Sequence, residues 1–171
     1  GIIAEYNPFH NGHRYHLLNS KKQTGCKYSI AVMSGQFLQR GEPAIFDKWI
    51  RTKMALSAGI DLIIELPFVF STQDANGFAY AGIRLLESLG IIDYVSFGCE
   101  NNQIELLSEI AEVLTREPQP FRQLIKKELK KGSNYPRIRE KAIIEYFDKY
   151  HKLSENISIE QIKLALNQPN N

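Results

Sequence analysis

Short apolar runs alternate with longer amphipathic stretches over the first hundred residues of the chain. Four runs have the length and continuity of buried strands, at residues 1–6, 28–33, 61–66 and 94–97. Helical patterns follow the first three, each with a glycine just past its end, at residues 11–24, 43–58 and 75–89. Continuous apolar strands that alternate with helices are typical of a parallel sheet covered on both faces and joined by right-handed crossovers. The pattern therefore predicts the α/β class and a Rossmann-like fold.

The strand pattern stops near residue 100, and only helical patterns follow. They lie at residues 104–114, 121–131, 135–150 and 158–167. Ser158 and Gln161 have the spacing of a capping box at the start of the last of them. We therefore expect two domains, a Rossmann-like sheet layer at residues 1–100 and a helical subdomain packed on it at residues 101–171.

The composition favours a soluble, folded protein. The chain is 43% hydrophobic and 23% charged, and none of its apolar runs approaches the roughly 18 residues of a membrane-spanning helix. Cys26 and Cys99 are too few and too far apart for a disulfide framework, so they indicate a reducing compartment. We therefore expect a cytoplasmic protein. Because Gly1 lies inside the first predicted strand and no closing element follows residue 167, we also expect the chain to be truncated.

The net charge of +2 is distributed unevenly. Residues 116–141 contain nine Lys or Arg and three Asp or Glu, whereas residues 1–115 contain nine and twelve. The basic residues Arg122, Lys126, Lys127, Lys130 and Lys131 could follow the phosphates of an RNA, which would position the RNA without selecting a base. The alternative is an ordinary solvated helix face.

The sequence YNPFHNGH at residues 6–13 stands between the first strand and the following helix. Open α/β sheets bind ligands at this edge, where the N–H groups of a helix N-terminus attract phosphate and Gly12 permits close approach. His10 and His13 can donate to charge that develops on phosphate oxygens, so the pattern favours nucleotidyl transfer. The alternative is a turn with an asparagine cap and exposed histidines. No cysteine accompanies the pair and His151 is distant, so we predict no metal site.

HNGH resembles the H-x-G-H signature of the nucleotidyltransferase superfamily, which implies a sheet of the HUP type. Four segments in order and spacing resemble the bacterial tRNA(Met) cytidine acetate ligase family: GIIAEYNPFHNGHRYHL, MSGQFLQRGEPAIFDKWIRTKMAL, AGIDLIIELPF and VSFGCE. The resemblance implies that acetate is adenylated with ATP, usually with Mg2+, and that pyrophosphate is released. The acetyl group then passes to N4 of the wobble cytidine of elongator tRNA(Met).

The resemblance also implies site residues, with His10 and His13 catalytic. It assigns ATP binding to Ile3, Ala4, Glu5, Tyr6, Asn7, Pro8, Phe9, His10, Asn11, Gly12, His13, Arg14, Tyr15, His16, Gly98 and Asn170. The family chain continues beyond this one with more ATP-binding and substrate-binding sequence, including an arginine for which this chain has no position. GSNYPRIR at residues 132–139 matches loosely and transfers no role to its arginines. The K-M-S-K-S loop of aminoacyl-tRNA synthetases and the I-S-S-T-x-x-R motif of coenzyme adenylyltransferases are absent.

A second polar set follows the second predicted strand, at the same edge of the sheet. We predict that it walls the acetyl adenylate or the incoming cytidine, and its members are Ser34, Gln36, Gln39, Arg40, Lys48 and Arg51. The alternative is a solvated loop with Arg40 or Arg51 in structural ion pairs, for example Arg51 with Asp47. Lys126, Lys127 and Lys130 are the corresponding candidates for tRNA phosphates.

Three further residues have a functional and a structural interpretation. Glu65 ends the third predicted strand near the site, but a cap or ion-pair role is favoured. Trp49 and Tyr80 could stack on a base, but aromatics on amphipathic helices are favoured as core residues.

An ionised acetate needs no general base to attack a phosphate, so we assign none. Two alternative functions stay open, an adenylyltransferase of coenzyme metabolism and a non-catalytic RNA-binding module. The sequence does not indicate the oligomeric state of the protein.

Overall fold

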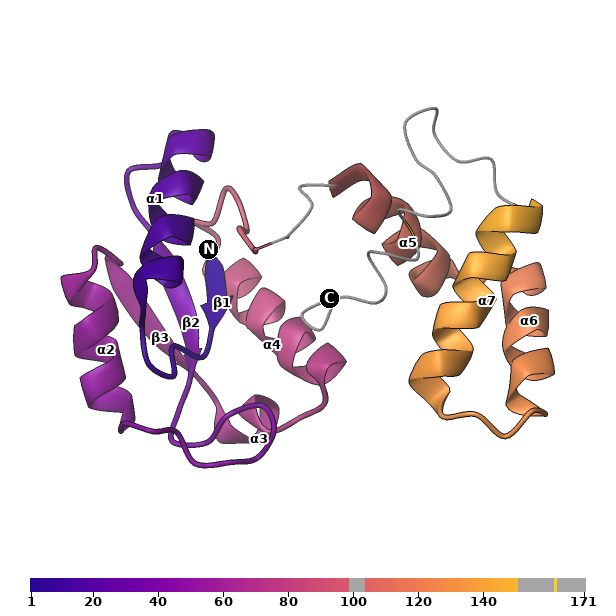
Figure 1. Ribbon diagram of the computed structural model, residues 1–171. Coiled ribbons are helices and arrows are strands. Elements are labelled where there is room, and N and C mark those ends of the chain that lie inside the picture. The colour runs from indigo at the N-terminus through magenta and orange to yellow at the C-terminus, as the bar shows by residue number, and fades with distance from the viewer. Residues whose placement is uncertain (99–103, 151–161, 163–171) are drawn as a thin grey trace. The chain divides into compact units, whose positions relative to one another are not determined.

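The computed structural model describes residues 1–98, 104–150 and Ile162. The chain divides into two compact units, Gly1–Gly98 and Cys99–Asn171 (Figure 1). The helix predicted at residues 158–167 lies outside the described residues apart from Ile162, which is helical and buried.

The first unit contains a three-stranded parallel sheet. Its strands are β1 (Ile2–Ala4), β2 (Ile30–Ser34) and β3 (Leu62–Leu66), in the order β1-β2-β3. Ile3 is paired with Val32, and Val32 with Ile64, so the apolar runs lie in register across the sheet. The predicted parallel α/β sheet is confirmed.

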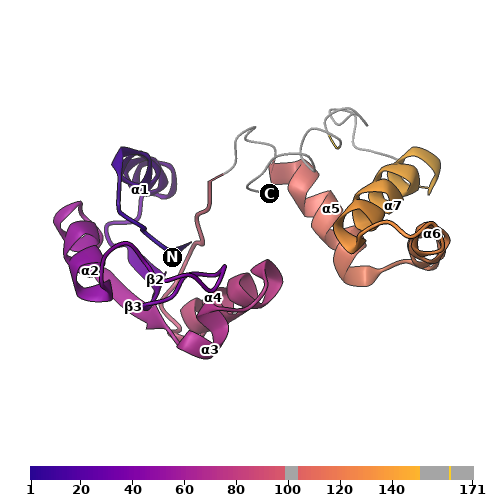
Figure 2. The ribbon, with the colours of Figure 1, turned by 60° about the horizontal axis from the view of Figure 1, so that its bottom comes forward.

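Helices cover both faces of this sheet (Figure 2). Alternate strand residues point to opposite faces, so one core cluster joins Ile2, Ala31 and Met33 to Leu17 of α1 (Asn11–Thr24) and Ala55 of α2 (Lys48–Ser57). A second cluster, on the other face, joins Val32 and Leu66 to Ala81 and Leu86 of α4 (Ala75–Ser88). Because strand side chains alternate between the two faces, one face of the sheet packs against α1 and α2 and the other packs against α4.

Two helical elements differ from the predictions. α2 begins at Lys48 and not near residue 43, because the side chain of Asp47 accepts a hydrogen bond from the backbone N–H of Ile50 and caps the helix there. Pro43 instead forms an antiparallel bridge with Phe37. The one-turn helix α3 (Phe68–Ser71), directly after Pro67, is too short for the sequence pattern to have predicted it.

The fourth predicted strand, at residues 94–97, is only partly formed. Its contact with the sheet is a single parallel bridge between Ser96 and Ile2. The Ser96 N–H donates to the Gly1 carbonyl at 2.8 Å, and the Gly1 amino group donates to the Tyr94 carbonyl at 2.6 Å. The prediction of a full strand is wrong because the ladder extends over too few residues, although the segment does lie beside β1.

The second unit is helical over its described residues. Its helices are α5 (Ile104–Arg116), α6 (Gln119–Leu129) and α7 (Tyr135–Tyr150). α6 and α7 pack side by side, and their buried core includes Phe121, Leu124, Ile143 and Phe147 (Figure 1). Among the described residues, no helix of either unit combines the length and apolar character needed to span a membrane.

Candidate active site

The loop between β1 and α1 carries the HNGH sequence at the carboxyl edge of the sheet. It begins with Tyr6, whose backbone φ of 48° turns the chain away from the strand and whose side chain is 3% exposed. The Tyr6 ring packs against Phe9 with centroids 4.8 Å apart and meets His13 edge-on at 4.9 Å. This aromatic contact ties the start of α1 to the core below it.

His10 and His13 cap the first turn of α1 reciprocally. His10 is the N-cap residue, and its Nδ1 accepts a hydrogen bond from the backbone N–H of Gly12 at 3.1 Å. The Nδ1 of His13 accepts from the backbone N–H of His10 at 3.2 Å. Two imidazoles thus take the places of serine and glutamate in a capping box. The alternative with an asparagine cap is wrong, because Asn11 is already the first helical residue.

This capping determines which ring nitrogens can donate. Because both Nδ1 atoms accept, the rings of His10 and His13 are neutral tautomers that carry their proton on Nε2. Burial is the main cause that lowers the pKa of His13 to about 4, and the neighbouring imidazoles of His10 and His16 lower it further because they disfavour a second positive charge beside them. The two rings stack with centroids 3.7 Å apart. The pair therefore supplies two adjacent neutral N–H donors at the positive end of a helix.

Gly12 leaves room for the His10 ring in its capping position. A Cβ at position 12 would lie 2.9 Å from His10 Cε1 and 3.0 Å from its Nδ1, closer than a carbon atom can comfortably approach. Any larger residue would therefore displace the imidazole or break its cap. The glycine also exposes the backbone N–H groups of the first turn to a ligand.

His16 connects α1 to the segment beside β1. The Nε2 of His16 lies 2.9 Å from Ser96 Oγ, which lies 2.6 Å from Ser20 Oγ. Because the Ser20 hydroxyl donates to the His16 carbonyl at 2.7 Å, Ser96 donates to Ser20 and the His16 Nε2–H donates to Ser96. Burial lowers the pKa of His16. The contact of His16 with Ser96 could not be predicted from the sequence, because the two residues lie 80 positions apart.

The other predicted ATP-site residues lie in different surroundings. Gly98, which follows the Ser96 segment, is exposed, and a Cβ there would meet no atom within 4 Å. The side chain of Ile3 packs in the core against Gly82 of α4, so only the backbone of Ile3 could face a nucleotide. Asn170 and His151 lie outside the described residues.

The loop between β2 and α2 is bound to the histidine loop. Glu5 Oε1 accepts from the backbone N–H of Gln39 at 2.6 Å, and Asn7 Oδ1 accepts from that of Ile45 at 2.8 Å. The Gln39 side chain donates to the Gln73 carbonyl at 2.8 Å. The structure therefore brings Gln39 next to Glu5, at the start of the histidine loop.

Gln36 and Arg40 are exposed on the same loop. Ser34, in contrast, is fully buried at the end of β2, and its hydroxyl has no hydrogen-bond partner among the described residues. The prediction that Ser34 contacts substrate is wrong, because its side chain does not reach the surface.

Two charged residues of α2 have structural partners. Lys48 Nζ lies 2.6 Å from Glu65 Oε2, which confirms the ion-pair interpretation of Glu65. Arg51 is 0% exposed, and its guanidinium donates to the backbone carbonyls of Glu5, Ser34, Gly35 and Phe46. The prediction that Arg51 contacts adenylate or tRNA is therefore wrong. The expected ion pair between Arg51 and Asp47 is not formed in the described part of the chain, where the Asp47 carboxylate caps α2 and affects Arg51 only through its charge.

The two aromatic residues favoured as core residues lie on the surface. Trp49 and Tyr80 are each 67% exposed. The core interpretation is therefore wrong for both. Trp49 has the Lys48 ammonium 5.3 Å from its ring centroid, a cation–π contact.

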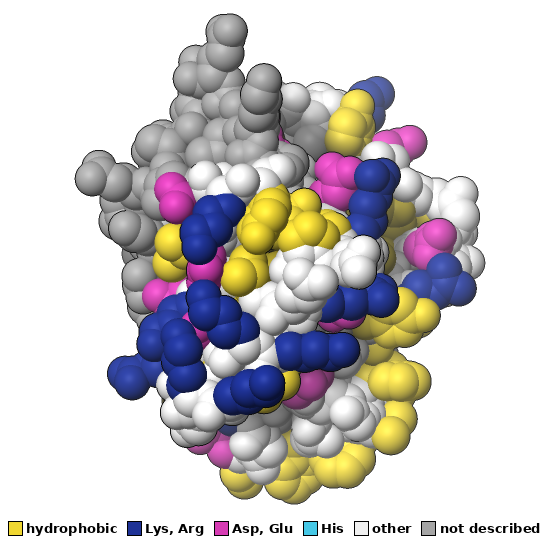
Figure 3. Space-filling view, turned by 90° about the vertical axis from the view of Figure 1, so that its right-hand side faces the viewer, with side chains coloured by type: hydrophobic (Ala, Val, Ile, Leu, Met, Phe, Trp, Pro, Cys, Tyr) yellow, Lys and Arg dark blue, Asp and Glu magenta, His cyan; other side chains and the backbone are white. Residues whose placement is uncertain are grey.

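The basic segment contains paired and unpaired charges. Lys127 Nζ lies 3.1 Å from Glu145 Oε1, and Lys131 pairs with Glu128. Lys126 and Lys130 are exposed and have no ion-pair partner within the described part of the chain. Figure 3, which views the side of the molecule that carries α6 and α7, shows Lys and Arg side chains gathered on one face with acidic side chains among them.

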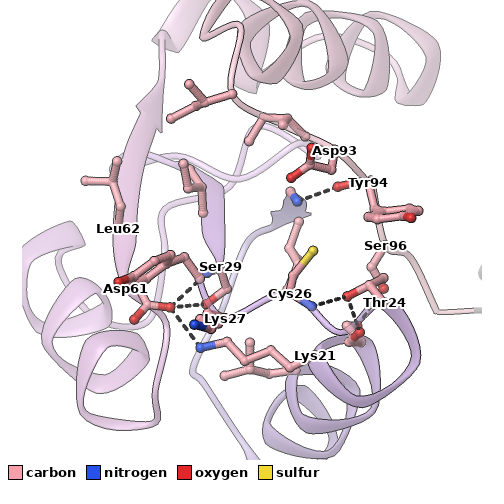
Figure 4. Close-up of a pocket in the computed structure, with 18 residues that line it drawn as sticks. Lys21, Thr24, Cys26, Lys27, Ser29, Asp61, Leu62, Asp93, Tyr94 and Ser96 are labelled. Atoms are coloured by element: carbon pink, nitrogen blue, oxygen red, sulfur yellow. Dashed lines mark hydrogen bonds and ion pairs between the residues drawn. The ribbon is translucent and has the colours of Figure 1, made fainter.

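A cavity of about 480 Å³ lies at the opposite, amino edge of the sheet (Figure 4). On one side of it Asp61 accepts from Lys21 Nζ at 2.8 Å and from the backbone and hydroxyl of Ser29 at 2.8 and 2.9 Å. The Lys21 hydrogen bond is the main reason that the pKa of Asp61 lies below its ordinary value. This cavity shares no residue with the HNGH loop, but Ser20 and Ser96 line it and connect it to His16 of α1.

The HNGH loop on a parallel α/β sheet defines a nucleotidyltransferase class of protein. A model of the family described as HIGH Nucleotidyl Transferase matches residues 1–171, and the chain belongs to that family.

Individual proteins that are similar to this chain have a stated function. The tRNA(Met) cytidine acetate ligase of Thermoanaerobacter sp. (strain X514) is 54% identical over 162 residues, which are 95% of this chain and 39% of the relative. The ligase of Halothermothrix orenii is 46% identical over 173 residues, which are 100% of this chain and 40% of the relative. A crystal structure of Thermotoga maritima TmcAL bound with alpha-thio ATP is 43% identical with a TM-score of 0.90, over 99% of this chain and 40% of that one. The chain thus spans about two fifths of these proteins.

Proposed function

We propose that the full-length protein is an ATP-dependent acetate ligase that acetylates N4 of the wobble cytidine in elongator tRNA(Met). The observation that carries this proposal is the 54% identity over 162 residues to a tRNA(Met) cytidine acetate ligase. The similar Thermotoga maritima protein binds alpha-thio ATP in its crystal structure, which supports ATP as the nucleotide. We propose that the protein acts in the cytoplasm, where ATP and tRNA are available. The presence of only two cysteines in the sequence, Cys26 and Cys99, agrees with a reducing compartment.

The proposed reaction has two steps. An acetate oxygen attacks the α-phosphorus of ATP, the bond to the bridging oxygen of the β-phosphate breaks, and pyrophosphate leaves. The cytidine N4 then attacks the acetyl carbon, AMP leaves, and N4 loses a proton. Activation must come first, because AMP is a far better leaving group than the oxide of free acetate.

In the first step His10 and His13 act as neutral donors. Their Nε2–H groups, with the backbone N–H groups of the first turn of α1, would hold the charge that develops on the phosphate oxygens. We propose that ATP lies along residues 3–16, next to Gly98, with Asn170 as a further contact. A carboxylate is already ionised at neutral pH, so this step needs no general base.

Magnesium would enter with the nucleotide. Mg2+ is usually held by substrate phosphates and few protein carboxylates, and the described residues contain no group of three or more His, Cys, Asp or Glu that could hold a metal. Bound to the phosphates, it would neutralise charge on the departing pyrophosphate.

The acceptor tRNA requires further surface. We propose that Gln36, Gln39 and Arg40 wall the adenylate or the cytidine. Lys126 and Lys130, with a smaller share from Lys127, would contact tRNA phosphates, because the ammonium of Lys127 already pairs with Glu145. Such contacts position the RNA and do not select the base.

The test uses the full-length protein with labelled acetate, ATP and unmodified elongator tRNA(Met). We expect label in N4-acetylcytidine at the wobble position by nuclease digestion and mass spectrometry, and none in a matched transcript with uridine there. ATP turnover with a coenzyme precursor but not with acetate would contradict the proposal in favour of a coenzyme adenylyltransferase. Binding of tRNA without any nucleotide turnover would contradict it in favour of a binding module.

A further inference from the structure

Arg51 is a buried cation, and within residues 1–98 and 104–150 its guanidinium binds backbone carbonyls and no carboxylate. Its Nε donates to the Phe46 carbonyl at 3.0 Å and its Nη1 to the Glu5 carbonyl at 2.6 Å. Its Nη2 donates to the carbonyl of Ser34 at 3.1 Å and also to that of Gly35. One side chain of α2 thus holds the backbone at the carboxyl ends of both β1 and β2.

These acceptors stand at the ends of the two loops that form the candidate site. Gly35 begins the loop between β2 and α2, and Phe46 lies at its other end, next to the Asp47 cap. Glu5 is the last residue before the turn at Tyr6. A lysine could not replace the arginine here, because only the planar guanidinium fork presents several fixed donors in one plane.

The hydrogen bond from Arg51 to Glu5 connects Arg51 to the histidines through Tyr6. Glu5 is bonded to Tyr6, which is buried, and the ring of Tyr6 meets His13 edge-on at 4.9 Å. A shift of the Glu5 carbonyl would therefore move the ring that supports His13. The carboxylate of Glu5 also accepts a hydrogen bond from the Gln39 N–H at 2.6 Å, so a shift of Glu5 would also move the loop between β2 and α2.

The contacts of Arg51 require a buried cation with several donors. Burial lowers the pKa of Arg51, while the nearby charges of Glu5, Asp47 and Glu65 raise it, so the buried guanidinium keeps its positive charge. An apolar side chain could fill the same space, but it would leave the buried carbonyls at the strand ends without donors.

We infer that Arg51 is a positioning residue of the nucleotide site. Through the carbonyls of Glu5, Gly35 and Phe46 it sets the spacing between the histidine loop and the loop between β2 and α2. The expected effect of Arg51 on kcat rests on the proposed function. Its effect on the geometry of His10 and His13 does not.

The experiment compares full-length wild type with Arg51→Lys, and uses Lys53→Ala, an exposed residue of the same helix, as the matched control. Ring ¹⁵N chemical shifts of His10 and His13 report the geometry without ATP. Acetate-dependent pyrophosphate exchange reports kcat and the KM for ATP. We expect Arg51→Lys to move the His13 ring signals and to lower kcat about 100-fold, as for a displacement near 1 Å, with the KM for ATP changed less than about threefold. Lys53→Ala should change neither.

A lower melting temperature with unchanged histidine shifts and unchanged kcat per folded molecule would overturn the inference and leave Arg51 a structural residue. If the wild type itself lacks acetate-dependent exchange, the proposed function fails, while the histidine shifts still decide the role of Arg51. If Arg51→Lys does not fold, the NMR signal of the Arg51 Nε–H group in the wild type tests whether Arg51 is a positioning residue. We expect that signal to shift when a non-hydrolysable ATP analogue binds, unlike that of the exposed Arg84, and a constant signal would overturn the inference.

Discussion

The two edges of the sheet in the first unit use polar groups in opposite ways. At the amino edge, the carboxylate of Asp61 accepts three hydrogen bonds from Lys21 and Ser29 beside a cavity of about 480 Å³. At the carboxyl edge, His10 and His13 accept only through Nδ1 and keep Nε2–H as a donor.

The difference teaches that the edge to which we assign ATP is distinguished by its available hydrogen-bond donors and not by the size of a cavity. At Asp61 the oxygen Oδ2 accepts all three hydrogen bonds, so this oxygen is committed to the fold and has little capacity left for a ligand. The histidines are held by one nitrogen and leave the other one for chemistry. Variants that remove an available group should therefore affect activity more than variants that remove an occupied one.

Loss of a histidine donor should have the largest effect. We expect His10→Ala and His13→Ala in the full-length protein each to lower kcat of acetate-dependent pyrophosphate exchange by roughly 100-fold to 1000-fold, because each removes one donor to developing phosphate charge. Circular dichroism should report a folded protein in both. A kcat within about threefold of wild type in either variant would refute the donor role of that residue.

A methyl group at Gly12 should impair the same donors indirectly. Gly12→Ala places a Cβ 2.9 Å from the His10 ring, so we expect at least about a tenfold fall in exchange activity. Gln23→Ala, on the exposed surface of the same helix, is the matched control and should leave activity unchanged. Equal activities of the two variants would show that the capped position of His10 does not matter.

The contrast between occupied and available groups should also hold for the lysines of α6 and α7. We expect Lys126→Ala with Lys130→Ala to weaken tRNA binding and to reduce the slope of log affinity against log salt by roughly 0.7–0.9 for each phosphate that is no longer neutralised. Lys149→Ala removes a lysine that already pairs with Glu145 at 2.6 Å and should change the slope little. Identical slopes in all three proteins would remove α6 from the tRNA surface.

The smallest effects concern stability against pH. The pKa of His13 is about 4 in the fold against 6.5 unfolded, so the unfolded chain takes up the proton first and stability should fall as pH decreases from 6.5 to about 4. The pKa of Asp61 is lowered from 3.8, so its contribution is complete above pH 3.8 and lost as pH falls below it.

Melting temperatures of wild type, His13→Gln and Asp61→Asn between about pH 7.5 and about pH 3 separate the two residues. His13→Gln should lose the decline between pH 6.5 and about 4. Asp61→Asn should cost about 1 kcal/mol or less near neutral pH, because the Lys21 pair is partly exposed, and should leave exchange activity unchanged. The reverse assignment of the two pH windows would contradict the described contacts.

Much of the fold could be predicted from the sequence because it depends on local pattern. Helix α7 covers the predicted residues 135–150, and α1 ends at Gly25, whose φ of 70° suits glycine. The HNGH loop could be placed at the carboxyl edge for the same reason, since strand and helix periods bracket it.

Features that depend on tertiary contacts could not be predicted. The start of α2 follows from the Phe37–Pro43 bridge and the Asp47 cap, and neither has a periodic signal. Arg51 belongs to a polar stretch in the sequence, yet the strand ends bury it. Trp49 shows the converse, because an aromatic residue on a helix stays exposed when no element packs over it in the described part of the chain.

The donor pair at the start of α1 is central to the proposed activation of a carboxylate with ATP. Its most direct test is exchange of labelled pyrophosphate into ATP by the full-length protein, with and without acetate, in wild type and His10→Ala. We predict exchange that depends on acetate and is lost in His10→Ala. Acetate-dependent exchange that persists at the wild-type rate in folded His10→Ala, or its absence from a wild type that binds ATP, would contradict this role.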